Sequence, residues 1–317
     1  MRFIAPAAEL GRRLLPLAIA GALSLTIAAC GGGTASPEAT ADTGALVATA
    51  APVESATEAT PSTVTVQVDQ VIWFAGFKVA LGAATAELTP GRGGSVTIEA
   101  TFENTGDESA RFDGSLNLAS AGENATEGIG MDIPSVPGGQ TGKGTLAFDV
   151  EDSFTFDEAV LTVGRSANQQ AIVPLTATAG SAVTLEPVAV AVSGSGTAGD
   201  LKLELNDAEL RADQPWNHGQ MAQGSLVLTV TYDASFESDF AGGFAFTAEN
   251  VALKLPDGTT VGTIQDGESQ SLELIGPNAT VKDQFSRFEI EDRAAGDYVL
   301  LVRSFDNAED EIPFSIK

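Results

Sequence analysis

The sequence has very few of the residues on which disulfides, metal sites and most enzyme sites depend. Its 317 residues include one cysteine, Cys30, and one histidine, His218. A lone cysteine cannot close a disulfide within the chain, so a folded domain must be stabilised by its core alone. A zinc site usually needs three protein ligands, and a hydrolase triad needs a histidine. The composition therefore predicts no cofactor, no metal site and no enzymatic activity.

Basic residues are also scarce. The chain has 16 Lys and Arg against 43 Asp and Glu, which gives a formal net charge of −27. Phosphates would repel such a chain, so nucleic acid is excluded as a partner. A charged partner should be cationic, such as a metal ion, a basic peptide or an amino sugar. The acidity also fits plain solubility through self-repulsion, or adaptation to salt.

The first 29 residues have the layout of a secretory signal. Arg2, Arg12 and Arg13 precede an apolar run over residues 14–27, and Ala28-Ala29 supplies small residues for cleavage. The run is shorter than the ~20 residues that a transmembrane helix needs. A transmembrane helix, an ordinary signal with an incidental cysteine and a twin-arginine signal remain as alternatives.

The residues Ile27-Ala28-Ala29-Cys30 resemble the lipobox of bacterial lipoproteins. The resemblance implies that the Cys30 thiol carries acyl chains such as palmitate and becomes the new N-terminus. Two or more chains give stable anchoring, whereas one chain does not. We therefore expect a protein anchored through Cys30 at the extracytoplasmic face of the cell membrane.

Residues 30–62 should form a linker. Residues 31–62 are rich in Gly, Ala, Ser, Thr, Pro and Glu and contain no aromatic residue. Too little apolar surface is present to offset the entropy of ordering, so we predict a disordered tether.

From Val64 onward the pattern changes to short strands, and no long segment with helical periodicity appears. The clearest strand covers residues 95–103, where Val96, Ile98, Ala100 and Phe102 alternate with polar residues. A second strand with the same alternation covers residues 225–233. Such alternation is typical of half-buried antiparallel strands.

The strands recur in one order, which indicates a duplicated domain. The matched segments are 77–81 with 201–205, 86–88 with 208–210, 95–103 with 225–233, 148–152 with 288–292 and 173–175 with 312–314. We predict an all-β protein with two tandem immunoglobulin-like β-sandwich domains over residues 63–178 and 179–317. The predicted core residues are Val96, Ile98, Phe102, Phe148, Leu226, Leu228, Tyr232 and Phe288. The longer second copy should carry inserted loops around Trp216 and over residues 241–265, and the residues near 177–183 should form a short hinge between the copies.

The first copy also resembles a known family. The lead-in Val71-Ile72-Trp73-Phe74-Ala75-Gly76-Phe77, the strand with Asn104-Thr105-Gly106, the segment from Pro137-Gly138-Gly139 to Phe148 and the ending Ala171–Leu175 are similar to the DUF4352-type immunoglobulin-like domains of bacterial surface lipoproteins. The resemblance covers roughly residues 64–176 and, more faintly, 200–316. It implies an exported sandwich and no known chemistry, so it supplies no functional residue.

The loop around Trp216, Asn217 and His218 is the possible partner-binding site. A loop tryptophan can stack on a sugar or a peptide, although it can equally cover the end of its own sandwich. We interpret His218 as an exposed loop residue. The acidic strand ends at residues 149–152 and 289–292 would suit calcium, but no calcium-loop signature accompanies them.

These observations favour a non-enzymatic surface module, lipid-anchored and extracytoplasmic, that binds an unknown protein, glycan or cationic partner or contributes to the envelope. A solute-binding or sensing lipoprotein that serves a membrane complex is the alternative. A carboxylate-based hydrolase is a third hypothesis, since paired Asp and Glu side chains can hydrolyse glycosides.

Overall fold

The computed structural model describes residues 60–120, 125–129, 132–266, 272–291 and 295–317. Within these residues the chain is all-β, as predicted, and its only helical elements are the short 3₁₀ helices η1 (Ala177–Ala179) and η2 (Ala248–Asn250). Residues 57–317 form one compact unit. The predicted signal, the predicted lipid attachment at Cys30 and nearly all of the predicted linker lie outside the described residues.

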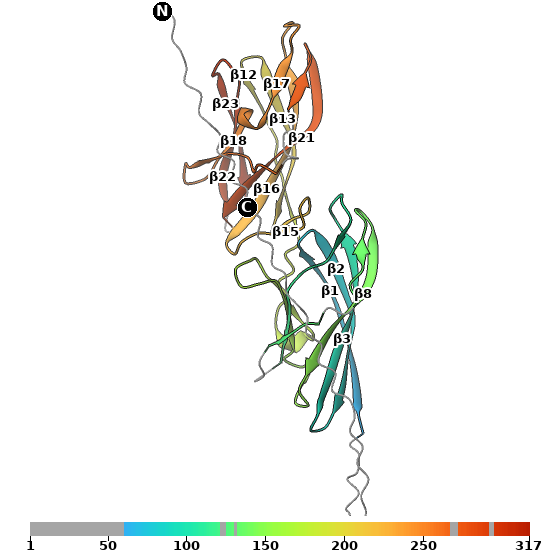
Figure 1. Cartoon of the computed structure of the whole chain (residues 1–317). Helices are drawn as coiled ribbons and strands as arrows, with labels where there is room; N and C mark the ends of the chain where they lie inside the picture. Colours follow the sequence, from blue (N-terminus) through green and yellow to red (C-terminus); the bar gives the residue numbers. More distant parts are fainter. Residues whose placement is uncertain (1–59, 121–124, 130–131, 267–271, 292–294) are drawn as a thin grey trace, which may run out of the picture. The chain divides into compact units, whose positions relative to one another are not determined.

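The strands β1 to β10 form the first sandwich. Their bounds are β1 (Ser62–Phe74), β2 (Phe77–Thr89), β3 (Gly93–Asn104), β4 (Ala110–Arg111), β5 (Leu116–Ala119), β6 (Thr126–Glu127), β7 (Ser135–Val136), β8 (Thr141–Val150), β9 (Val160–Val163) and β10 (Ala171–Pro174). One sheet has the strand order β1-β2-β3-β8, and these four strands are labelled in Figure 1. The other has the order β10-β9-β5-β6, and β4 pairs with β7.

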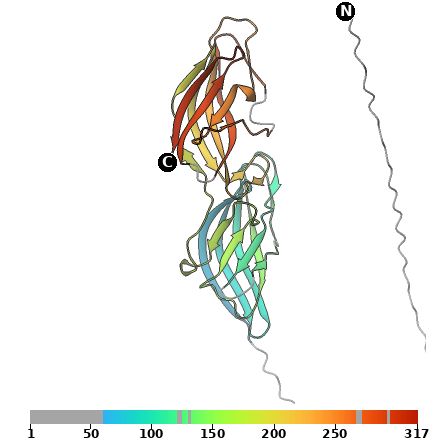
Figure 2. The same cartoon turned by 90° about the vertical axis from the view of Figure 1, so that its left-hand side faces the viewer.

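The strands β11 to β23 form the second sandwich. Their bounds are β11 (Val188–Val190), β12 (Ser195–Ala198), β13 (Leu201–Arg211), β14 (Asp213–Gln214), β15 (Gly219–Gln220), β16 (Ser225–Phe236), β17 (Phe244–Phe246), β18 (Val251–Lys254), β19 (Thr260–Val261), β20 (Glu273–Ile275), β21 (Ala279–Glu291), β22 (Gly296–Arg303) and β23 (Glu309–Ile316). One sheet has the order β11-β13-β16-β21, with β12 also paired to β13. The other has the order β19-β18-β22-β23, and β17 pairs with β20. Figures 1 and 2 show the two layers of each sandwich.

The two sandwiches have the same strand order. The sheet β1-β2-β3-β8 corresponds to β11/β12-β13-β16-β21, with the long β1 replaced by the two short strands β11 and β12. The sheet β10-β9-β5-β6 corresponds to β23-β22-β18-β19, and the pair β4-β7 corresponds to β17-β20. This one-to-one correspondence is what a duplicated domain would give.

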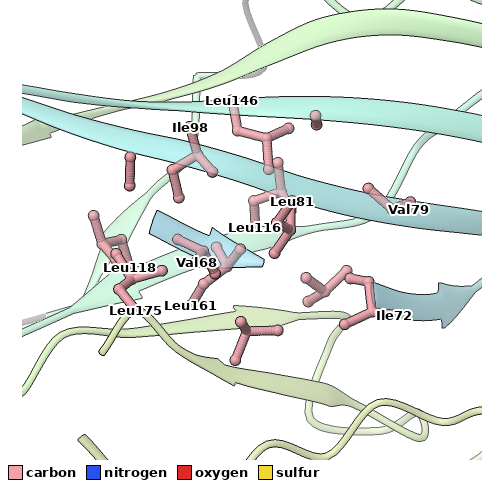
Figure 3. Close-up of a cluster of buried hydrophobic side chains, with 14 of the residues drawn as sticks. Val68, Ile72, Val79, Leu81, Ile98, Leu116, Leu118, Leu146, Leu161 and Leu175 are labelled. Atoms are coloured by element: carbon pink, nitrogen blue, oxygen red, sulfur yellow. The ribbon is translucent and has the colours of Figure 1, made fainter. Parts of the chain in front are cut away.

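Each sandwich buries its own hydrophobic core. Figure 3 shows the first core, in which Ile98 and Leu146 from one sheet face Leu116, Leu118 and Leu161 from the other. Seven of the eight predicted core residues are confirmed as buried: Val96, Ile98, Phe102, Phe148, Leu228, Tyr232 and Phe288. The eighth, Leu226, is half-buried and packs against the second core.

The strand register corrects one detail of the predicted alignment. Val96 pairs with Phe148 in the first sandwich, and Leu228 pairs with Phe288 in the second. Leu228, and not Leu226, is therefore the counterpart of Val96. Because side chains alternate with period two, a shift of two residues keeps Leu226 on the core face, although it is only half-buried there.

Two expectations about connecting segments are wrong. Residues 241–265 are not an inserted loop, since they contain β17, β18 and β19. The stretch 177–183 is not a free hinge, because η1 occupies its start and Val183 forms an isolated bridge with Ile172. The predicted domain boundary at 178/179 is thus followed by residues that still pack on the first sandwich, including Leu185.

Candidate functional site

The loop predicted to bind a partner connects β14 to β15. Asn217 fixes its turn, because the Asn217 main-chain N–H donates to the Gln214 carbonyl at 3.2 Å and the Asn217 side-chain oxygen accepts from the Gly219 N–H at 2.8 Å. His218 follows with a positive φ of 53°, a left-handed conformation in which histidine is among the less unfavourable residues. Local hydrogen bonds therefore hold Trp216 and His218 in place.

One side of this loop packs against the first sandwich. The ring centroids of His218 and Phe77 are 5.6 Å apart. A Cβ atom at Gly76 would lie 2.9 Å from His218 Nδ1, and one at Gly106 would clash with the Pro215 carbonyl. Both positions therefore need glycine. The two ring nitrogens of His218 are buried without a hydrogen-bond partner in the described part of the chain, so the interpretation as an exposed histidine is wrong.

A buried ion pair lies at the base of the loop. Arg211 donates to Asp213 through Nε at 2.9 Å and through Nη2 at 3.2 Å, and Asp213 Oδ2 also accepts the Gly76 N–H at 2.9 Å. Burial lowers the pKa of Arg211, but the hydrogen bonds and charges of Asp213 and Glu209 outweigh it and raise that pKa above its ordinary value. Arg211 therefore stays charged and joins the second sandwich to Gly76 through Asp213.

Further hydrogen bonds join the two sandwiches beside this pair. The Ala75 N–H donates to Gln220 Oε1 at 2.9 Å. Asn168 and Ala222 form an isolated antiparallel bridge. The turns at one end of the first sandwich are thus bonded directly to the segment that follows the Trp216 loop.

An open groove lies next to Trp216. Arg287 stacks on the Trp216 ring at 3.7 Å and on the Phe285 ring at 4.5 Å, while its Nη1 donates to Asp266 at 2.6 Å. The groove has a volume of about 240 Å³. Residues of both sandwiches line it: Thr105, Gly106, Asp107, Glu209, Arg211, Pro215, Trp216, Thr229, Thr231, Phe285 and Arg287.

The lining chemistry suits a polar ligand that has one apolar face. The charge of Arg287 is matched by Asp266, and that of Arg211 by Asp213. Glu209 and Asp107 then leave the groove with excess negative charge, while threonine hydroxyls offer hydrogen bonds. Aromatic stacking with carboxylates and hydroxyls is a common arrangement for binding sugars or cationic groups.

The other residues singled out in the sequence have structural positions. Phe74 and Phe77 are in the first core, and the centroid of the Trp73 ring lies 5.4 Å from the Arg211 guanidinium carbon. At the acidic strand ends, Asp152 accepts a hydrogen bond from the Gly91 N–H at 2.7 Å. Within the described ranges, no three His, Cys, Asp or Glu side chains gather closely enough to hold a metal ion.

Neither the known family models nor the curated proteins include a match to this chain. Across the residues that the structure covers, no helix has the length and apolarity needed to cross a membrane.

Sequence reasoning singled out Trp216 but missed Arg211, Asp213, Phe285 and Arg287. Arg211 and Asp213 flank the loop in the sequence, so their proximity was a usable signal. Phe285 and Arg287 come from β21, some 70 residues later, and only strand pairing brings them under Trp216.

Proposed function

We propose that this protein is a lipid-anchored extracytoplasmic module that binds a partner at the Trp216 groove and catalyses no reaction. The signal-like residues 1–29 and the lipobox-like end at Cys30 support the anchor. The observation that carries the binding role is the groove itself. It combines a tryptophan stacked on an arginine with hydroxyl and carboxylate groups, and both sandwiches contribute to it.

The chemistry of the groove favours an amino sugar polymer as the ligand. A sugar ring offers one apolar face for stacking, and its hydroxyls match Thr229 and Thr231. Protonated amino groups would complement Glu209 and Asp107, and they suit a chain of net charge −27.

Titration with soluble glucosamine oligomers should test this function. Trp73→Phe leaves Trp216 as the only tryptophan, so a saturable change in fluorescence should report binding. Calorimetry on Trp216→Ala should show about tenfold weaker binding, the equivalent of ~1.4 kcal/mol. Glu209→Gln should weaken binding at low salt but have little effect at high salt, because screening removes its contribution.

Phe240→Ala is the matched control, since Phe240 is an exposed aromatic side chain that does not line this groove. It should bind the oligomers like the parent protein. Binding that is unsaturable, or that is equal in Trp216→Ala and the parent, would count against the groove as the site.

The anchor has its own test. Cys30→Ser should abolish incorporation of labelled fatty acid and should leave the protein soluble or uncleaved, because the thiol is the atom that is acylated. Membrane fractionation and fatty-acid labelling measure the two effects. Unchanged labelling and retention in Cys30→Ser would contradict anchoring at this residue, and would leave the groove proposal to be judged by its own titration.

A further inference from the structure

In the first sandwich, an extended segment closes the gap between two sheet edges. β1 is the edge strand of one sheet and β10 is the edge strand of the other. We call the gap between these two edge strands, and the corresponding gap in the second sandwich, the seam. Ile172 in β10 exchanges two hydrogen bonds with Val183, at 2.9 and 2.8 Å, and the Trp73 N–H in β1 donates to the Thr184 carbonyl at 2.8 Å. The segment 181–185 thus bonds to both edges, and Leu185 packs against the core.

The corresponding seam in the second sandwich lies between β12 and β23. Phe74 and Phe77 are the last paired residues before the turn between β1 and β2, and Ala198 and Leu201 are the last before the turn between β12 and β13. Thr197, which precedes Ala198, is therefore the counterpart of Trp73, which precedes Phe74. On the other side of the seam, Val163 in β9 pairs with Ala171 in β10, and Val302 in β22 pairs with Asp310 in β23. In both copies seven residues lie between the two paired residues. Each of these loops contains the same type of turn bond, from Asn168 to Arg165 and from Asn307 to Ser304, so Glu311 is the counterpart of Ile172.

At this second seam, one side chain takes the place of the extended segment. The Thr197 N–H donates to Asp310 Oδ2 at 2.7 Å, and the Glu311 N–H donates to Asp310 Oδ1 at 2.9 Å. These are the counterparts of the two N–H groups that bond to the Thr184 and Val183 carbonyls in the first sandwich. The two carboxylate oxygens of Asp310 therefore stand where two peptide carbonyls stand in the first copy.

Room for a strand continues along the same edge. A groove of about 440 Å³ runs beside β11 and β23, lined by residues 188–191, Ser193 and residues 313–317. Pro313 has no N–H, and neither has its counterpart Pro174, so a strand at either seam would form its main-chain bonds to Glu311 or Ile172. The first sandwich holds its segment despite this proline.

We propose that the β12–β23 seam is a strand-binding site that Asp310 keeps closed. Its occupant is an extended segment of another protein with the chemistry of residues 181–185: small or apolar side chains at alternate positions and free main-chain groups at the centre. Such a strand would replace the Asp310 carboxylate with carbonyl oxygens and add its own N–H to the Glu311 carbonyl. This is strand addition to an open sheet edge, a common mode of peptide recognition.

Removing the Asp310 side chain should expose the site. The probe is a labelled peptide with the sequence of residues 180–187, added to Asp310→Ala and to the parent protein. The peptide should bind Asp310→Ala at least about tenfold more tightly than it binds the parent protein, because in the variant it no longer competes with the carboxylate. Asp257→Ala is the matched control, since it removes an exposed aspartate from a turn remote in sequence from the seam and should bind like the parent.

A second peptide separates strand addition from general stickiness. Replacing Val183 by proline in the peptide removes the N–H that would donate to Glu311, so binding should be lost, whereas isoleucine at that position should preserve it. If Asp310→Ala does not fold, the parent protein is titrated instead, and the amide signals of Thr197 and Glu311 must shift with the first peptide only. No binding by either protein, equal binding of the proline peptide, or self-association of Asp310→Ala without peptide binding would overturn the proposal.

Discussion

Asp213→Ala is expected to lower the free energy of unfolding by about 3–5 kcal/mol, the usual cost of breaking a buried ion pair from one side. Asp213 is 1% exposed and Arg211 is 11% exposed, so the substitution leaves a guanidinium without its main partner in a poorly solvated place. It also removes the acceptor for the Gly76 N–H. Chemical denaturation measures the loss, and hydrogen exchange should show reduced protection at the Gly76 amide.

Glu209→Gln provides the matched comparison. Glu209 also pairs with Arg211, at 3.3 Å, but its side chain is 45% exposed. Surface pairs are typically worth 0–1 kcal/mol, so this change should have a small effect. The double variant Arg211→Met with Asp213→Ala should recover part of the stability, because no unpaired buried charge remains. An Asp213→Ala effect no larger than that of Glu209→Gln would contradict the role of this ion pair.

Phe288→Ala is expected to destabilise the protein by about 3–5 kcal/mol through the cavity it leaves. Phe288 is fully buried and pairs with Leu228 between β21 and β16 of the second sandwich. Phe148→Ala should have a similar effect, since Phe148 is its counterpart in the first sandwich and pairs with Val96. Thermal and urea unfolding of the variants give the two values.

Phe240→Ala removes the same side chain from the surface. Phe240 is 66% exposed, so its loss should change stability by no more than about 0.5 kcal/mol. Similar effects for Phe288→Ala and Phe240→Ala would show that the assigned register of β21 is wrong, because a shift by one residue would move Phe288 out of the core.

The duplicated pattern was readable in the sequence because strand alternation is a local property. The strands 95–103 and 225–233 were predicted by residue alternation alone, and both are buried on the expected face. The fine alignment between copies was not readable, because strands with the same alternation match equally well after a shift of two residues. The bulges were also visible only in the strand pairing. The pairing of β2 with β3 is interrupted between Leu81 and Ala84, and that of β13 with β16 between Leu205 and Asp207.

The sequence by itself determined the all-β class, the alternating core positions and the expectation of an anchor at Cys30, since each depends on residues close together in the chain. Only the tertiary structure decided what surrounds Trp216 and His218. Arg287 reaches Trp216 from a distant strand, and Phe77 meets His218 across the junction of the two sandwiches. The same holds for Asp310, whose role depends on two N–H groups that strand pairing brings to one carboxylate. Contacts between strands far apart in sequence are fixed by sheet order and register, and alternation alone does not encode them.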